Sequence, residues 1–125
     1  MAARMVYQIP KCSHITPYLT ELHWLPVEYR IQFKVILHTF KGLHKLAPVY
    51  ICNMFKLKSS PYSLRSNGAI TLVILKTTCK TLEDRSLAVA GPTLWNNLPE
   101  SLRSMDNLDQ FKAELKTFLF RKAFF

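Results

Sequence analysis

The sequence contains few of the residues from which recognisable enzyme sites are built. Its three glycines, Gly42, Gly68 and Gly91, lie far apart, so no glycine-rich loop is available to wrap around a phosphate group. No serine lies in the strand-to-helix turn that exposes a catalytic nucleophile. We therefore predict no cofactor and no small-molecule substrate.

Cysteine is also scarce. Cys12, Cys52 and Cys79 are odd in number and widely spaced, which argues against a disulfide framework and favours a reducing compartment. The four histidines do not combine with them at the spacing of a structural zinc site, so no metal site is predicted. We expect an intracellular protein. The choice between nucleus and cytoplasm stays open, because no dense block of Lys and Arg is present.

Long apolar runs are missing as well. The longest, ITLVIL at 70–75, is far shorter than the roughly 18 residues that a membrane-spanning helix needs. The first ten residues hold an arginine and no extended apolar stretch, which does not indicate a signal peptide. We expect no membrane span. A chain of 125 residues with 49% hydrophobic content predicts a single domain over 1–125, large enough to form its own core.

Acidic residues are few, and their scarcity is greatest in the first half of the chain. The 17 Lys and Arg side chains outnumber the 8 Asp and Glu side chains, giving a net charge of +9. Residues 1–65 hold nine basic and two acidic side chains, whereas 66–125 hold eight and six. The positive field of the first half would attract polyanions such as RNA, DNA or anionic lipid.

The stretch 22–48, LHWLPVEYRIQFKVILHTFKGLHKLAP, predicts a long amphipathic helix between Pro26 and Pro48. At 3.6 residues per turn, one narrow face is apolar and contains Tyr29, Phe33, Ile36, Phe40, Leu43 and Ala47. The opposite face is basic and contains Arg30, Lys34, Lys41 and Lys45. We predict that the first face lies in the core and that the second faces water or phosphate.

The second half of the chain predicts a hairpin and a final helix. Asn67 and Gly68 form a hairpin signal that would join a strand near 63–65 to one at 70–76. Gly91 and Pro92 are expected to break regular structure, leaving a turn and a brief helix. The last helix is expected to open near Asp106 and to dock an apolar stripe on the core. The predicted fold class is a mainly helical α+β domain with one short β-hairpin.

Four blocks of sequence, read in order, resemble one known family. They are LHWLP, KGLHKLAP, EDRSLAVAGPTLWNNLPESLR at 83–103, and FKAELKTFLFRKAF at 111–124. Together they look like the C-terminal region of a LINE-type (non-LTR, jockey-like) retrotransposon reverse transcriptase, downstream of the polymerase palm, and the resemblance runs from about Ala2 to the end. Ile74 and Leu75 stand where family members usually carry Pro and Arg, and Glu83 stands where Gly is usual. The resemblance implies an N-terminally truncated fragment of a larger polyprotein.

The carboxylates that reverse transcription requires are not recognisable here. That chemistry uses carboxylates holding two metal ions about 3.5–4 Å apart. The sequence has only Asp84, Asp106 and Asp109, and none lies in a paired-aspartate turn. Glu83 and Asp84 precede Arg85, which favours a local ion pair over a metal site. We therefore expect no enzyme activity.

What remains is a binding function. In a polymerase of this type, the region beyond the palm is expected to flank template and primer, where cationic helices contact phosphates. The sequence thus predicts weak, sequence-independent RNA or DNA binding through the basic face, Arg30, Lys34, Lys41 and Lys45. Trp24 and Trp95 are expected in the core, with base stacking as the alternative. A protein-interaction module or an inert mobile-element remnant are the alternative functions.

Overall fold

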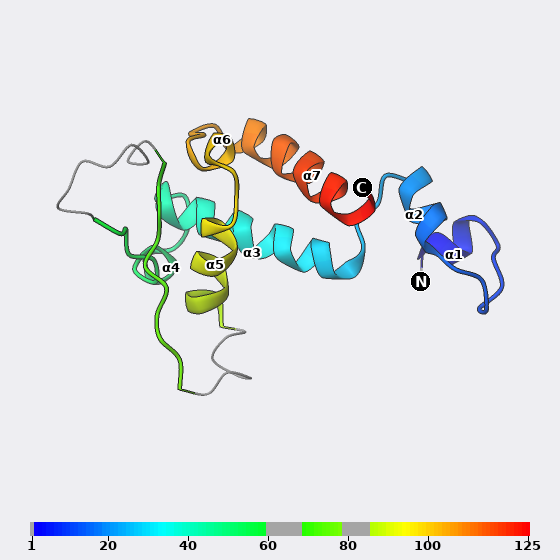
Figure 1. Ribbon diagram of the computed structural model, residues 1–125, viewed down its shortest axis with the longest axis horizontal. Helices are drawn as coiled ribbons and strands as arrows, with labels where there is room; N and C mark the ends of the chain where they lie inside the picture. Colours follow the sequence, from blue (N-terminus) through cyan, green and yellow to red (C-terminus); the bar gives the residue numbers. More distant parts are fainter. Residues whose placement is uncertain (1, 60–68, 79–85) are drawn as a thin grey trace.

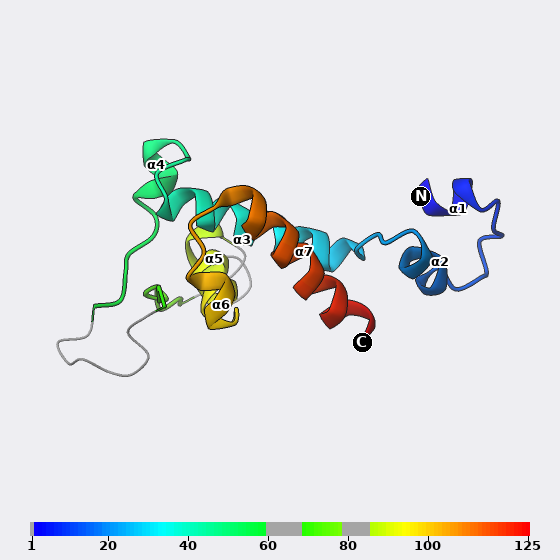
Figure 2. The ribbon, with the colours of Figure 1, turned by 90° about the horizontal axis from the view of Figure 1, so that it is seen from above.

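The computed structural model describes residues 2–59, 69–78 and 86–125, and within these ranges the regular structure is helical (Figure 1). The helices, in chain order, are α1 (Ala2–Val6), α2 (Thr16–Glu21), α3 (Val27–Leu43), α4 (Val49–Cys52), α5 (Leu87–Asn96), α6 (Glu100–Arg103) and α7 (Leu108–Phe124). Helix α3 is central and contacts α4, α5 and α7. Helix α7 runs antiparallel to α3, while α1 and α2 lie beyond the N-terminal end of α3, so the molecule is elongated (Figures 1 and 2).

The sequence explains where α3 starts and stops. The helix begins directly after Pro26, whose ring fixes a backbone φ suited to a helix start. At the other end, Lys45 adopts a left-handed conformation with φ of 57°, and the Leu46 N–H donates to the Lys41 carbonyl at 2.8 Å. This is a Schellman turn, which satisfies carbonyls left free at a helix end. The helix therefore ends at Leu43, and Lys45 lies outside it.

The core is an aromatic cluster shared by three helices. The rings of Phe40 in α3 and Phe111 in α7 stack with centroids 4.2 Å apart, and Trp95 of α5 lies 5.9 Å from Phe111. All three side chains are completely buried. Leu115 and Leu119 extend the same buried stripe along α7. The prediction that α7 docks on the core is confirmed, and so is the predicted apolar face of α3 as far as Leu43; Ala47 lies beyond the helix end, so its place on that face was wrong.

Helices α3 and α5 approach closely where each carries a glycine. The ring of Phe55, which follows α4, occupies the space beside both. A Cβ added to Gly42 would lie 2.8 Å from that ring, and one added to Gly91 would lie 2.8 Å from the ring and 2.7 Å from the Thr39 hydroxyl oxygen. Real Cβ atoms do not approach other atoms this closely. The close approach of the two helices therefore requires glycine, which has no side chain, at both positions.

The predicted α+β fold class is wrong for the described part of the chain, because no strand forms there. Residues 63–65 and the Asn67–Gly68 turn lie outside the described residues. The segment 70–76 is extended but makes only an isolated antiparallel bridge, from Leu72 to Leu57. Among the described residues, its backbone partner is the segment 56–58.

Side chains of α5 and α6 supply the other edge of this extended segment. The Leu72 N–H donates to the Asn96 side-chain oxygen, and the Asn96 amide donates to the Leu72 carbonyl, both at 2.9 Å. The Trp95 indole N–H donates to the Ile70 carbonyl at 2.9 Å, and Arg103 contacts the Thr71 hydroxyl at 3.2 Å. Asparagine thus takes the place of a neighbouring strand, which is why no sheet is needed to hold Leu72 in the core.

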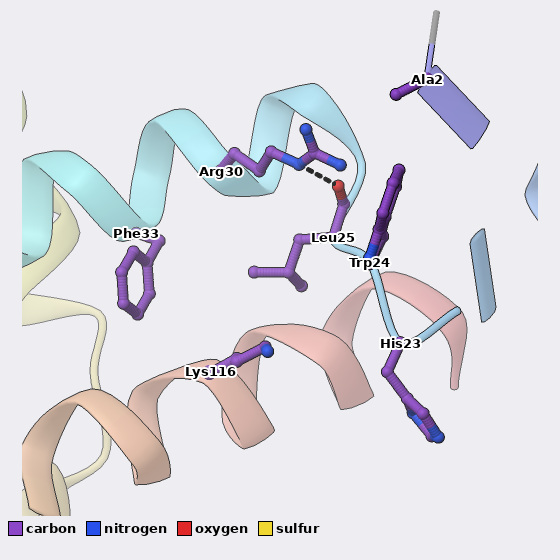
Figure 3. Close-up of a pocket in the computed structure, with 7 residues that line it drawn as sticks. All are labelled: Ala2, His23, Trp24, Leu25, Arg30, Phe33 and Lys116. Carbon is purple, nitrogen blue, oxygen red and sulfur yellow. Dashed lines mark hydrogen bonds between the residues drawn. The ribbon is translucent and has the colours of Figure 1, made fainter. Parts of the chain in front are cut away.

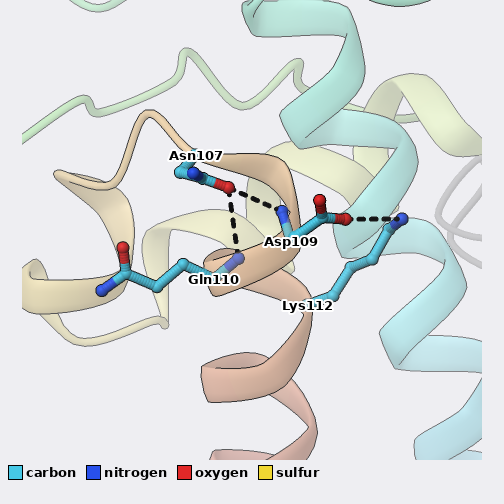
Figure 4. A network of polar contacts seen from close by, with 4 residues as sticks. All are labelled: Asn107, Asp109, Gln110 and Lys112. Atoms are coloured by element: carbon cyan, nitrogen blue, oxygen red, sulfur yellow. Dashed lines mark hydrogen bonds and ion pairs between the residues drawn. The ribbon is translucent and has the colours of Figure 1, made fainter.

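Two helix boundaries also differ from the sequence predictions. Pro92 lies inside α5, which continues to Asn96 instead of breaking into a turn and a brief helix. Helix α7 is capped by Asn107 and not by Asp106. The Asn107 side-chain oxygen accepts from the backbone N–H groups of Asp109 and Gln110, at 2.9 and 3.3 Å (Figure 4). Asn107 has the extended backbone that an N-cap requires, so it satisfies two free amides directly.

Replacing Gly91 by alanine should destabilise the fold, although alanine is the better helix former by about 1 kcal/mol. The new Cβ would collide with Phe55 and Thr39, and overpacking of this kind costs about 1–3 kcal/mol. Urea unfolding measures the change. In a Phe55→Leu background the contact with the ring is removed while the contact with Thr39 stays, so Gly91→Ala should cost less. An equal loss of stability in both backgrounds would show that the Phe55 ring is not the reason why position 91 requires glycine.

Replacing Asn96 by alanine should lower the free energy of unfolding by about 2–6 kcal/mol, because the buried N–H and C=O of Leu72 each lose a partner and each loss costs about 1–3 kcal/mol. The neighbouring exposed Asn97 is the matched control, and Asn97→Ala should change stability by less than about 0.5 kcal/mol. Equal effects of the two substitutions would refute the pairing role of the Asn96 amide.

Candidate nucleic-acid interface

Three of the four basic residues that the sequence indicates share one side of α3. At about 100° per residue, Arg30, Lys34 and Lys41 fall within about 40° of one another around the helix axis. Arg30 and Lys34 are exposed, and Lys41 is partly exposed in the last turn. Lys45 is exposed too, but it lies on the Schellman turn beyond the helix end. The structure thus brings three of the predicted cations onto one surface and places the fourth at its margin.

These cations are not neutralised by described acidic side chains. Among the residues that the structure describes, the only ion pair joins Lys112 to Asp109, at 3.7 Å within α7 (Figure 4). Both partners are solvent-exposed, so this pair contributes little to stability. The positive charge of Arg30, Lys34 and Lys41 therefore stays available to an external anion.

Arg30 is the most firmly positioned of these residues. Its Nε–H donates to the Leu25 carbonyl at 2.7 Å, and its guanidinium carbon lies 5.7 Å from the centre of the Trp24 ring. The second contact is a cation–π interaction, which is favourable at this separation. Together the two contacts fix the guanidinium while leaving its terminal N–H groups for a ligand (Figure 3).

A pocket of about 500 Å³ opens beside Arg30, between the start of α3, the second half of α7 and the turn that joins α2 to α3. Its lining residues are Ala2, His23, Trp24, Leu25, Arg30, Phe33 and Lys116. Arg30 and Lys116 approach it from different helices, with the Leu25 side chain between them (Figure 3). No carboxylate lines it, so its chemistry is that of a mostly apolar hollow with two cations.

The turn before α3 places Trp24 at this pocket. His23 adopts a left-handed conformation with φ of 52°, and the Trp24 N–H donates to the Leu19 carbonyl at 2.9 Å. This repeats, at the end of α2, the Schellman geometry seen after α3. The His23 ring in turn packs on Phe120 of α7, with centroids 5.4 Å apart. The turn that carries Trp24 is therefore held by contacts to two helices.

Sequence reasoning missed two contributors to this site. Nothing in the sequence links Lys116 to the basic face of α3, and only the antiparallel packing of α7 on α3 brings it to the same pocket as Arg30. Trp24 was expected in the core, but it is only partly buried, whereas the same expectation for Trp95 is confirmed.

Comparisons with known proteins add no assignment, because no family model, no curated protein and no solved structure matches the chain. Over 2–59, 69–78 and 86–125, no group of three or more His, Cys, Asp or Glu side chains could hold a metal ion. Within the same ranges, no helix combines the length and the apolar character needed to cross a membrane. Function is therefore argued from the basic surface and the pocket.

Replacing Lys45 by glycine should stabilise the protein, although it removes a charge from the margin of the site. A side chain in the left-handed region costs about 1–2 kcal/mol, and glycine avoids that cost, so we expect a gain of about 1 kcal/mol in urea unfolding. Gly at Lys34, in the middle of α3, is the control and should destabilise by about 1 kcal/mol. A loss of stability on Lys45→Gly would contradict the Schellman turn.

Proposed function

We propose that this chain is a non-catalytic domain that binds RNA or DNA weakly, through phosphate contacts and without reading sequence. The observation that carries the proposal is the unneutralised group of Arg30, Lys34 and Lys41 on one side of α3. Lysine and arginine on a single face are the typical means of phosphate contact, and they supply affinity without base specificity. Lys116 extends this surface onto α7.

We further propose that the domain derives from the C-terminal region of a LINE-type reverse transcriptase. Two of the four blocks that carry the resemblance flank α3, and the other two supply α5, α6 and most of α7; these helices pack around one core. Within the LWNNLP block, Trp95 and Asn96 form the hydrogen bonds that hold the extended segment at 70–72. The block therefore has a structural use that would account for a recurring motif.

The absence of enzyme activity is part of the same proposal. Asp106 and Asp109 lie exposed at the start of α7, and Asp109 is engaged by Lys112. Asp84 lies outside the described residues. Two exposed carboxylates at the start of a helix interact favourably with the positive end of its dipole. This role accounts for Asp106 and Asp109 without a metal ion.

A protein-interaction module is the second candidate, and the surface around α4 favours it. Leu46, Val49 and Tyr50 are 57%, 74% and 65% exposed. Apolar side chains gathered in this way are typical of surfaces that bind other proteins. Binding through them would depend little on salt, which separates this function from phosphate contact.

Salt dependence tests the proposed function. Labelled single-stranded RNA should bind with a slope of log affinity against log salt near −3 if about four phosphates are neutralised, at about −0.7 each. The double variant Lys34→Glu/Lys41→Glu should weaken binding at about 50 mM salt and reduce that slope by about 1.4. The loss follows from the removal of two phosphate contacts and the added repulsion.

The matched control is Lys56→Glu/Lys58→Glu, which changes net charge by the same amount at two exposed lysines in the segment that follows α4. It should leave the slope nearly unchanged. If both double variants weakened RNA binding equally, the RNA would be attracted by the net charge of the protein and not by the basic side of α3. Absence of binding in the unchanged protein would leave the protein-interaction module or an inert remnant.

A further inference from the structure

The two tryptophans of this protein occupy opposite environments. Trp95 is completely buried in the aromatic cluster and donates its indole N–H to the Ile70 carbonyl. Trp24 is only partly buried, stands at the edge of the pocket and has no hydrogen-bond partner for its indole N–H among the described residues. A large ring left partly in water beside a cation and a hollow is available to a ligand.

The pocket suits a ligand that is flat and apolar in one part and anionic in another. Leu25 and Phe33 provide apolar walls, and Trp24 provides an aromatic face. Arg30 and Lys116 provide positive charge from two different helices, with no carboxylate among the lining residues. A volume of about 500 Å³ lies within the range of about 300–1,000 Å³ that is typical of small-ligand pockets.

We propose that this pocket receives an unpaired base of a single-stranded nucleic acid. The base stacks on the Trp24 and Arg30 pair, and Arg30 and Lys116 contact the phosphates that flank it. This inference rests on the proposed function, and it deepens that function by naming single strands as the ligand. Aromatic rings and guanidinium planes are the surfaces on which proteins stack unpaired bases, and stacking tolerates any base sequence.

The geometry gives a reason to prefer single strands over duplexes. A base within a duplex is already stacked on both faces, so it can enter the pocket only after being extruded, which costs a few kcal/mol. An unpaired base has no such cost. The basic side of α3 contacts phosphates in either form, whereas the pocket adds affinity only for the single strand.

Intrinsic fluorescence provides a direct readout of the pocket. Because Trp95 is sealed in the core, a change in emission when oligonucleotide is added belongs to Trp24. Single-stranded oligoadenylate of about eight nucleotides, as RNA and as DNA, is a suitable probe, since such lengths are typical of single-strand sites. A phosphodiester chain of the same length made of abasic units is the matched probe without bases. We expect quenching by the first probe and little change with the second.

The variant Trp24→Leu tests the affinity. Stacking on one aromatic ring strengthens binding by about fivefold to a hundredfold per base, so Trp24→Leu should weaken binding of oligoadenylate by about tenfold. Binding of a duplex with the same number of phosphates should stay within about twofold, and the salt slope should not change, because no cation is removed. Tyr50→Leu, at an exposed aromatic on α4, is the matched control and should leave both affinities unchanged. Emission of the remaining Trp95 reports that each variant is folded.

Several results would overturn the proposal. Equal binding of oligoadenylate by Trp24→Leu and the unchanged protein, or equal binding of the abasic chain, would show that no base enters the pocket. If the Lys34→Glu/Lys41→Glu variant still weakened binding in that case, phosphate contact on α3 would stand and only the pocket would be rejected. If the unchanged protein bound no nucleic acid, both proposals would fall together.

Discussion

The structure depends on one close crossing, in which α3 and α5 meet around the ring of Phe55. Gly42 and Gly91 leave space for that ring, and the Thr39 hydroxyl lies beside it, donating to the Val35 carbonyl within its own helix. This contact fixes the position of α5 on the central helix. Every side chain that α5 directs toward the core, and every hydrogen bond that it makes to the extended segment, depends on that position.

The position of α5 in turn determines where other parts of the molecule lie. Its last turn carries Trp95, which joins the Phe40 and Phe111 stack, and Asn96, which pairs with the Leu72 backbone. One turn of helix thus connects the aromatic core with a segment that has no sheet to support it. Because Phe111 lies in the first half of α7, the same cluster sets where α7 lies on α3. The place of Lys116 near Arg30 follows from that alignment.

The sequence predicted elements well where a periodic apolar stripe was long, as in α3 and α7. Sequence-based prediction failed where the contacts of a single side chain determine the local structure. Asn96 acts as a strand partner, a role that no pattern of period two reveals, and so the pairing of Leu72 with Asn96 and with Leu57 was not predicted. Pro92 is accepted inside α5 because tertiary packing buries it. In the candidate site, the charges of α3 were visible in the sequence, but the approach of Lys116 is a property of helix packing alone.

The pocket proposed to receive a base is built on a turn that is already held in place by the fold. Its wall is a turn held from three sides: the Trp24 N–H bonds to α2, Arg30 of α3 bonds to the Leu25 carbonyl, and His23 packs on Phe120 of α7. A flexible loop would lose conformational freedom when it closed on a ligand, and affinity would fall accordingly. Here the ordering is already complete in the fold, and the left-handed backbone of His23 is stabilised by the same contacts. Under the proposed function, a single stacked base and two phosphate contacts would therefore contribute most of their free energy to binding.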